Sequence, residues 1–368
     1  MKSLAFGVAL AAFAAAAPLL ATPVLADVTV GTPRLIGQFV LPTGVAFQGV
    51  EFGGISGMDY DPRNDMYYAI SDDRSEHGPA RFYRLKLRID GKGVHGVDVL
   101  STVPLKDADG HTFLPRTIDP ESIRYDSASG HVFWSSEGDT KGNPGVYEAA
   151  TDGTMLRSLK LPDYYLPNSD HTQGTLDNLA FESLALSPDH KSLYAGLENG
   201  LAQDGGKTTP NAGSLSRIIK FDLGSGAPSA EYPIEIEKIH NQAKDGKTND
   251  NGMSEFMLFG GDDFLTLERG FSLGVGNEMN LYHVKLAGAT DVSGKATIKG
   301  TDFTPVSKEL VAKLGEGDFG LDVDNIECLT WGPVIDGTPT IVLVSDNNFS
   351  GSEFTQFVVF ALDGFKVE

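Results

Sequence analysis

The chain has 368 residues, of which 40% are hydrophobic, 21% charged and 9% aromatic. This composition is typical of a folded globular protein and excludes intrinsic disorder, collagen and coiled coil. The formal net charge of −21 repels phosphate backbones, and since the basic residues form no cluster we expect no nucleic-acid partner. The 43 glycines and 19 prolines indicate many turns between short strands, and therefore an all-β fold.

The N-terminus has the pattern of a secretory signal peptide. An uncharged run over residues 4–20 follows Lys2, and small residues, Val24 and Ala26, precede Asp27 at the positions that signal peptidase favours. We expect cleavage after Ala26, which leaves residues 27–368 as one periplasmic or secreted domain with no membrane span. The alternative is an N-terminal anchor, but the run is marginal in length and hydrophobicity, and no positive stop-transfer flank follows it. A single cysteine, Cys328, excludes an intramolecular disulfide.

Five segments of one pattern follow in chain order. Each has a polar residue, a short alternating strand, a turn and a second strand that ends at an acid. The leading polar residues are separated by 61 to 73 residues, which is room for one four-stranded sheet each. The segments begin near Ser56, Glu121, Glu182, Ser254 (with Glu255 beside it) and Glu327.

Two further strands are expected in each interval. They cover residues 81–88 and 94–105, 145–150 and 154–161, 214–223 and 230–237, and 279–286 and 296–303, with only 354–362 clear in the last unit. The missing outer strand there is supplied by Arg34 to Leu41, which closes a ring. The sequence therefore predicts a β-propeller of five four-stranded blades, with six blades or a β-sandwich as alternatives. One short helix is expected over Lys308 to Leu314, after Pro305 and before Gly315.

In a propeller the first strand of each blade lines the central channel, so the polar positions should gather at one mouth. Oxygen ligands without cysteine favour a hard cation, calcium first and magnesium second. The alternative is that the acids cap turns. We expect Glu121, Glu182 and Glu327 to be catalytic residues and also metal ligands. The other expected metal ligands are Asp72, Glu137, Glu198, Glu268 and Asp346.

Several arginines are close in the sequence to these acidic positions and could bind an anionic substrate. Arginine pairs bidentately with phosphate or carboxylate, although each one can instead neutralise a neighbouring acid. The expected substrate-binding residues are Arg74, Arg116, Arg269, Arg81 and Arg217. His77 and His111 lie in adjoining loops as candidate acid–base groups, with solvent-facing positions as the alternative.

Two other motifs are interpreted as structural. Gly270 to Gly274 fits the G-x-S-x-G pattern of esterases, but a strand rather than a helix is expected after it, which argues against Ser272 as a nucleophile. The segments 107–110 and 322–325 resemble parts of calcium loops without their full spacing, so we expect turns there.

Together these segments resemble the bacterial phytase-like domain family, also called the esterase-like activity of phytase family. The resemblance rests on residues 54–74, 119–121, 181–189, 267–270, 325–327 and 344–349 and spans nearly the whole mature chain. It implies an exported propeller and, through a more distant similarity to calcium-dependent propeller phytases, hydrolysis of phosphoric esters. Those phytases have six blades where this sequence predicts five.

Two functional hypotheses follow. The first is a calcium-dependent hydrolase of phosphate or related esters, with a small anionic substrate at the acidic mouth. The second is a non-catalytic propeller that binds a ligand, a metal or a partner protein.

Overall fold

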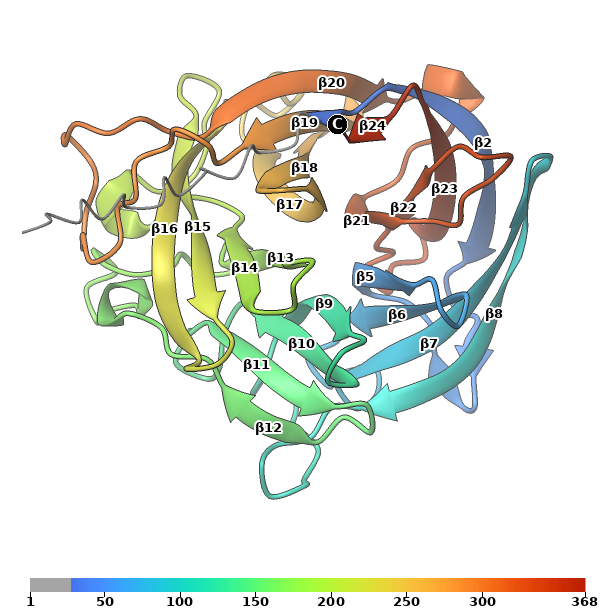
Figure 1. The fold of residues 1–368 in the computed structure, drawn as a ribbon, viewed down its shortest axis with the longest axis horizontal. Helices are drawn as coiled ribbons and strands as arrows, with labels where there is room; N and C mark the ends of the chain where they lie inside the picture. Colours follow the sequence, from blue (N-terminus) through green and yellow to red (C-terminus); the bar gives the residue numbers. More distant parts are fainter. Residues whose placement is uncertain (1–27, 368) are drawn as a thin grey trace, which may run out of the picture.

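The computed structural model describes residues 28–367 and shows a β-propeller of five four-stranded blades (Figure 1). Every blade is an antiparallel sheet, and its four strands are arranged side by side in order from the channel to the rim. Blade 1 contains β5 (Ile55–Asp61), β6 (Met66–Ser71), β7 (Arg81–Asp90) and β8 (Gly93–Pro104); blade 2 contains β9 (Pro120–Asp126), β10 (His131–Ser136), β11 (Gly145–Ala150) and β12 (Met155–Ser158).

The remaining blades follow in chain order. Blade 3 contains β13 (Phe181–Leu186), β14 (Ser192–Leu197), β15 (Ser214–Asp222) and β16 (Ala227–Ile236); blade 4 contains β17 (Asn249–Gly260), β18 (Asp263–Ser272), β19 (Gly276–Lys285) and β20 (Ser307–Gly315); blade 5 contains β21 (Ile326–Trp331), β22 (Thr340–Ser345), β23 (Phe354–Asp363) and β2 (Thr32–Pro42). Short pieces, β1 (Val28–Thr29) with β24 (Lys366–Val367) and β3 (Ala46–Phe47) with β4 (Val50–Glu51), complete the strands.

The ring is closed by the N-terminal strand, as the sequence predicts. β2 pairs with β23 from Thr32↔Asp363 to Pro42↔Phe354 and forms the outer edge of blade 5. A chain end that pairs with the other end joins the first and last blades and leaves only short edges unpaired. The predicted signal peptide lies outside the described residues, and no helix among those described is long and apolar enough to cross a membrane.

Blade 4 corrects two expectations. The helix expected over Lys308 to Leu314 is wrong, because these residues form β20, which pairs with β19 from Lys285↔Ser307 to Glu278↔Gly315. The fourth strand expected over residues 296–303 is also wrong, since that segment is a loop against blade 3, where the N–H of Ile298 donates to Asp204 Oδ1 at 2.8 Å. The unpaired edge of β19 needs a partner strand, and this tertiary ladder outweighs the local helix propensity of the segment.

The hydrophobic core is divided into five clusters, one between each pair of neighbouring blades. Between blades 2 and 3, for example, Phe133 and Val146 pack with Phe181 and Phe221. Blades 5 and 1 meet in the same way, and so do the other three pairs. Each buried apolar side chain contributes about 1.5–3 kcal/mol, so the blade contacts hold the five inner strands in fixed positions around the channel.

Candidate functional site at the mouth of the propeller

Each inner strand carries a β-bulge at the same place, near the strand's start. At the bulge the inner strand has one residue more than the second strand. In blade 3, Phe181 pairs with Leu197 and Ser183 pairs with Gly196, so Glu182 between them has no partner in the ladder. A bulge breaks the alternation of side chains and re-aims one of them. The extra residues are the five polar positions that the repeat predicted: Ser56, Glu121, Glu182, Ser254 and Glu327.

A second ring of residues comes from the second strand of each blade. In each case it is the residue directly after the one that pairs with the residue before the bulge. In blade 3, Leu197 pairs with Phe181, so Glu198 is the next residue and reaches the mouth. The same rule gives Asp72 in blade 1, Glu137 in blade 2, Arg269 in blade 4 and Asp346 in blade 5. Four blades therefore present an acid at this position, and one presents an arginine.

Glu268 is not part of this set, which corrects the expectation from the sequence. It pairs with Met253, one place earlier in the ladder than Arg269. A shift of one residue turns a side chain to the opposite face of a sheet. Glu268 is buried at 1% exposure, and its Oε1 accepts a hydrogen bond from Lys308 Nζ at 2.5 Å, inside blade 4.

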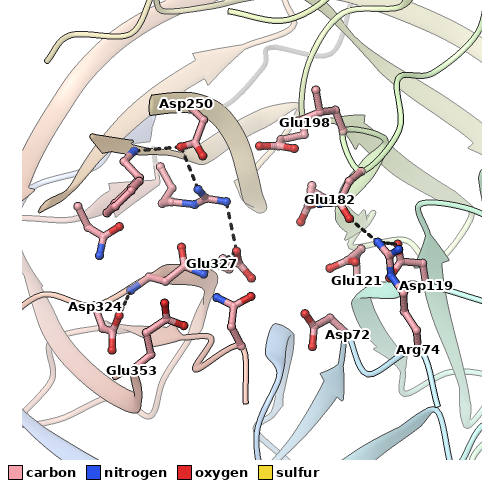
Figure 2. Close-up of a pocket in the computed structure, with 17 residues that line it drawn as sticks. Asp72, Arg74, Asp119, Glu121, Glu182, Glu198, Asp250, Asp324, Glu327 and Glu353 are labelled. Carbon is pink, nitrogen blue, oxygen red and sulfur yellow. Dashed lines mark hydrogen bonds and ion pairs between the residues drawn. The ribbon is translucent and has the colours of Figure 1, made fainter. Parts of the chain in front are cut away.

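The mouth contains a polar cavity of about 490 Å³ (Figure 2). Of the predicted ring, Asp72, Glu121, Glu182, Glu198 and Glu327 line this cavity, with Arg74 and Arg269. The remaining lining residues are Asp119, Asn178, Leu179, Asp250, Phe271, Asn277, Asp324, Asn325, Asn348 and Glu353.

Five of the acids form two overlapping groups. Oxygens of Asp119, Glu121 and Glu137 lie within 4.8 Å of one another, and so do oxygens of Glu137, Glu182 and Glu198. All five side chains are buried. Glu137 is common to both groups and lines a side pocket of about 220 Å³ next to the main cavity.

Burial and mutual repulsion raise the pKa values of these acids. The pKa of Asp72 is raised to about 8, first by burial and then by Glu327 and Asp119. Burial also raises the pKa of Glu198 to about 8, against the attraction of Arg269. Carboxylates cannot all ionise at close range without a cation or raised pKa values. The pKa values of Glu121, Glu137, Glu182, Glu327 and Asp346 are raised for the same reasons.

Two arginines reach the cavity from opposite sides. Arg74 Nε donates to Asp119 Oδ1 at 2.7 Å, and a second nitrogen of Arg74 contacts Asn178. Arg269 donates to Asp250 at 3.1 Å and to Glu327 at 3.3 Å. Figure 2 shows the guanidinium group of Arg74 beside the carboxylate of Asp119 at the edge of the open centre.

The other predicted substrate arginines lie elsewhere. Arg81 is fully buried and pairs with Asp73 at 2.5 Å, and Arg217 is fully buried between Asp204 and Glu231, at 2.7 and 3.0 Å. Both hold loops against their blades, so the structure does not bring them to the cavity. Arg116 is exposed, pairs with Glu76 at 2.8 Å and lines only the side pocket.

A buried ion pair connects inner strands of the propeller. Arg124 of β9 pairs with Glu255 of β17 at 2.8 Å, and Arg124 also donates to the carbonyls of Met58 and Phe256. Ser122 donates to the second oxygen of Glu255. These bonds connect the inner strands of three blades across the channel axis.

The candidate histidines and the serine motif have structural surroundings. The ring of His77 stacks on Phe349 with 4.1 Å between centroids, and His111 is exposed at a turn where its N–H donates to Asp107. Ser272 ends β18, a turn and β19 follow, and its hydroxyl donates to the carbonyl of Asn241 at 2.8 Å. The strand predicted after the motif is therefore confirmed as β19, whereas the esterase motif requires a helix at that place.

Sequence reasoning missed several residues of the cavity. Asp119 could have been predicted from the sequence, because it comes two residues before Glu121 in the repeated motif. Asp250 and Glu353 carry no such signal. Asp250 approaches the cavity at the start of β17, and Glu353 comes from the loop before β23.

Known proteins and solved structures have low similarity to this chain. A secreted protein of uncharacterised function from Arthroderma benhamiae is 26% identical over 171 residues, 39% of this chain and 33% of the relative, so the chain matches about a third of that protein's length. The solved Dos1 propeller has a TM-score of 0.34 at 8% identity, over 84% of this chain and 68% of that one. The RRP9 WD40 repeats have a TM-score of 0.38 at 10% identity, over 93% of this chain and all of that one.

The family model described as "Phytase-like: Esterase-like activity of phytase" matches residues 50–349, which include all five bulges and both arginines of the cavity. The chain therefore belongs to the phytase-like family.

Proposed function

We propose that the protein is an exported, calcium-dependent hydrolase of phosphate or related esters, with its active site in the acidic cavity. The observation that carries the proposal is the pair of overlapping carboxylate groups, with Arg74 and Arg269 on the wall beside them. Membership of the phytase-like family supports the ester chemistry. The secreted relative supports export, and the predicted cleavage after Ala26 supports a periplasmic or secreted location.

The residues fit a hard cation. All the candidate ligands are carboxylate oxygens, which calcium prefers over nitrogen or sulfur ligands. One oxygen each of Glu137, Asp72 and Asp346 is buried without a hydrogen-bond partner among the described residues. The metal would be held by Asp119, Glu121, Glu137, Glu182 and Glu198, with Asp72, Glu327 and Asp346 further round the ring. Bound calcium supplies positive charge for the substrate anion and acidifies a coordinated water.

The arginines would orient the substrate. Arg74 and Arg269 each present a planar group of donors that matches two oxygens of a phosphate or carboxylate. Both arginines now pair with acids of the wall. A substrate anion would pair with the arginines in place of these acids, and the acids would then be free to bind the cation. Glu327 belongs to neither carboxylate group and has a raised pKa, which suits a group that gives a proton to the leaving ester oxygen while water supplies the new bond. Glu121 and Glu182 would be ionised as ligands of the metal.

The test is a substrate panel on purified protein with calcium or with EDTA. We expect calcium-dependent hydrolysis of 4-nitrophenyl phosphate or bis(4-nitrophenyl) phosphate, and a loss of at least tenfold in Glu182→Gln. Glu309→Gln, an exposed glutamate on β20, is the matched control and should behave as wild type. Activity that EDTA leaves unchanged would contradict the calcium requirement.

A second candidate function is a non-catalytic propeller that binds a cation and a ligand or partner protein. The observation that favours it is that both cavity arginines are already ion-paired. In that case calcium would bind and stabilise the fold, but no phosphomonoester, phosphodiester or carboxylester of the panel would be hydrolysed.

A further inference from the structure

Glu137 stands between the two carboxylate groups. It follows β10 in blade 2, beside Asp119 and Glu121 of the same blade, and its oxygens also lie within 4.8 Å of those of Glu182 and Glu198 in blade 3. No other acid of the described residues belongs to both groups. The gap between blades 2 and 3 therefore has one carboxylate at its centre and two on either side.

The carboxyl group of Glu137 is held in this place by the backbone. One of its oxygens, Oε1, accepts a hydrogen bond from the N–H of Ala180, the residue before β13. The carbonyl of Ala180 in turn accepts from the N–H of Glu198 at 2.7 Å. Glu137 is thus oriented by blade 3 although it belongs to blade 2.

The second oxygen of Glu137 has no protein partner. Glu137 is only 3% exposed, and Oε2 is buried without a hydrogen-bond donor among the described residues. Buried polar atoms normally have a partner, because an unsatisfied one loses the hydrogen bond that it made to water. A buried carboxyl oxygen that has four other acids around it and no hydrogen-bond donor has the surroundings of a cation ligand.

The charge of the five acids exceeds what one divalent ion can neutralise. One ion would compensate two of the carboxylates, and Arg74 pairs with a third, Asp119. Arg269 attracts Glu182 and Glu198 at longer range, but its hydrogen bonds go to two acids outside both groups, Asp250 and Glu327. Two divalent cations would balance four of the five negative charges, with Arg74 beside the fifth.

We propose that the cavity holds two divalent cations that share Glu137 as a bridging ligand. One ion would take Asp119 and Glu121, and the other Glu182 and Glu198. This inference rests on the metal binding of the proposed function and adds the number of ions and the bridge. Paired metal sites of this kind occur in phosphatases and nucleases, where the two ions act on the attacking and leaving oxygens of one displacement.

Manganese is a suitable probe because two Mn²⁺ ions that share a carboxylate have a magnetically coupled EPR spectrum. EDTA-treated protein is titrated with Mn²⁺ alone, bound ions are counted by native mass spectrometry, and the variants Glu121→Gln, Glu198→Gln and Glu137→Gln are compared with Glu309→Gln. Circular dichroism verifies that each variant is folded.

We expect a coupled pair in wild type and in Glu309→Gln. Glu121→Gln and Glu198→Gln should each bind one ion fewer and lose the coupling, and Glu137→Gln should abolish the coupling as well. The inference is overturned if the wild-type ions are uncoupled, if all three variants remove the same single ion, or if Glu137→Gln keeps a coupled pair. If the protein hydrolyses esters with a single bound ion, the proposed function holds and this inference is wrong. If it binds a coupled pair of ions but hydrolyses no ester, this inference holds and the proposed function is wrong.

Discussion

In the absence of divalent cations, raising the pH from 5.5 to 7.5 should destabilise this protein. Asp72 and Glu198 have ordinary pKa values near 4, and the fold raises both to about 8. In this interval the folded protein keeps both protons, while the unfolded chain has released them. Stability falls with rising pH wherever the folded state binds more protons than the unfolded state.

The size of the effect follows from the number of protons. Each group that retains its proton costs about 1.4 kcal/mol of stability per pH unit, so Asp72 and Glu198 alone cost about 3 kcal/mol per unit. The other carboxyls of the ring with raised pKa values add to this cost. The unfolding entropy of about 2 cal/mol/K per residue amounts to about 0.7 kcal/mol/K for a chain of this size. The melting temperature of the cation-free protein should therefore fall by about 4 °C or more for each pH unit between 5.5 and 7.5.

Calcium should cancel this loss, because it binds the ionised carboxylates and competes with protons. The rise in melting temperature on adding millimolar calcium should accordingly be larger at pH 7.5 than at pH 5.5. Scanning fluorimetry at pH 5.5, 6.5 and 7.5, with EDTA or calcium, measures both slopes.

Variants locate the effect in the cavity. Glu198→Gln removes one titrating group and should reduce the fall in melting temperature by about 2 °C per pH unit, whereas Glu309→Gln on the exposed face of β20 should leave it unchanged. A melting temperature that is constant or rises with pH in EDTA would refute the reasoning, and so would an unchanged slope in Glu198→Gln.

Four further substitutions test separate parts of the structure. Arg269→Lys should preserve the fold and the calcium response but lower phosphate-ester turnover at least tenfold, since lysine lacks the bidentate group of donors; equal turnover in steady-state kinetics would remove Arg269 from substrate binding. Ser272→Ala should keep full hydrolysis and lose about 1 kcal/mol of stability with its single hydrogen bond, and loss of carboxylesterase activity would show that the serine is a nucleophile after all. Arg217→Met should destabilise by about 3–5 kcal/mol, because it leaves Asp204 and Glu231 buried without their partner; a denaturation midpoint equal to wild type would contradict this. Gly57→Ala should destabilise by about 1–3 kcal/mol, because its Cβ would lie 2.5 Å from the carbonyl oxygen of Glu121 across the inner strands, and chemical denaturation checks it.

The sequence alone determined the blade count and the inner ring. The five polar positions recur at intervals that each hold one sheet, and a strand has only two faces, so a repeated polar residue in a repeated strand reaches the same place in every blade. Residues 34–41 closed the ring because their length and alternation match a missing outer strand, and β2 pairs with β23 accordingly.

Tertiary structure decided which charges meet in the cavity. Glu268 and Arg269 are adjacent in the sequence, and only the ladder with Met253 determines which of them faces the mouth. Arg81 and Arg217 lie on third strands, and only the folded structure shows that Asp73 pairs with Arg81 and that Asp204 and Glu231 pair with Arg217 in buried positions. Residues 308–314 favour a helix locally, yet the free edge of β19 makes them a strand. Register and burial depend on segments far apart in the chain, and these are set when the blades pack.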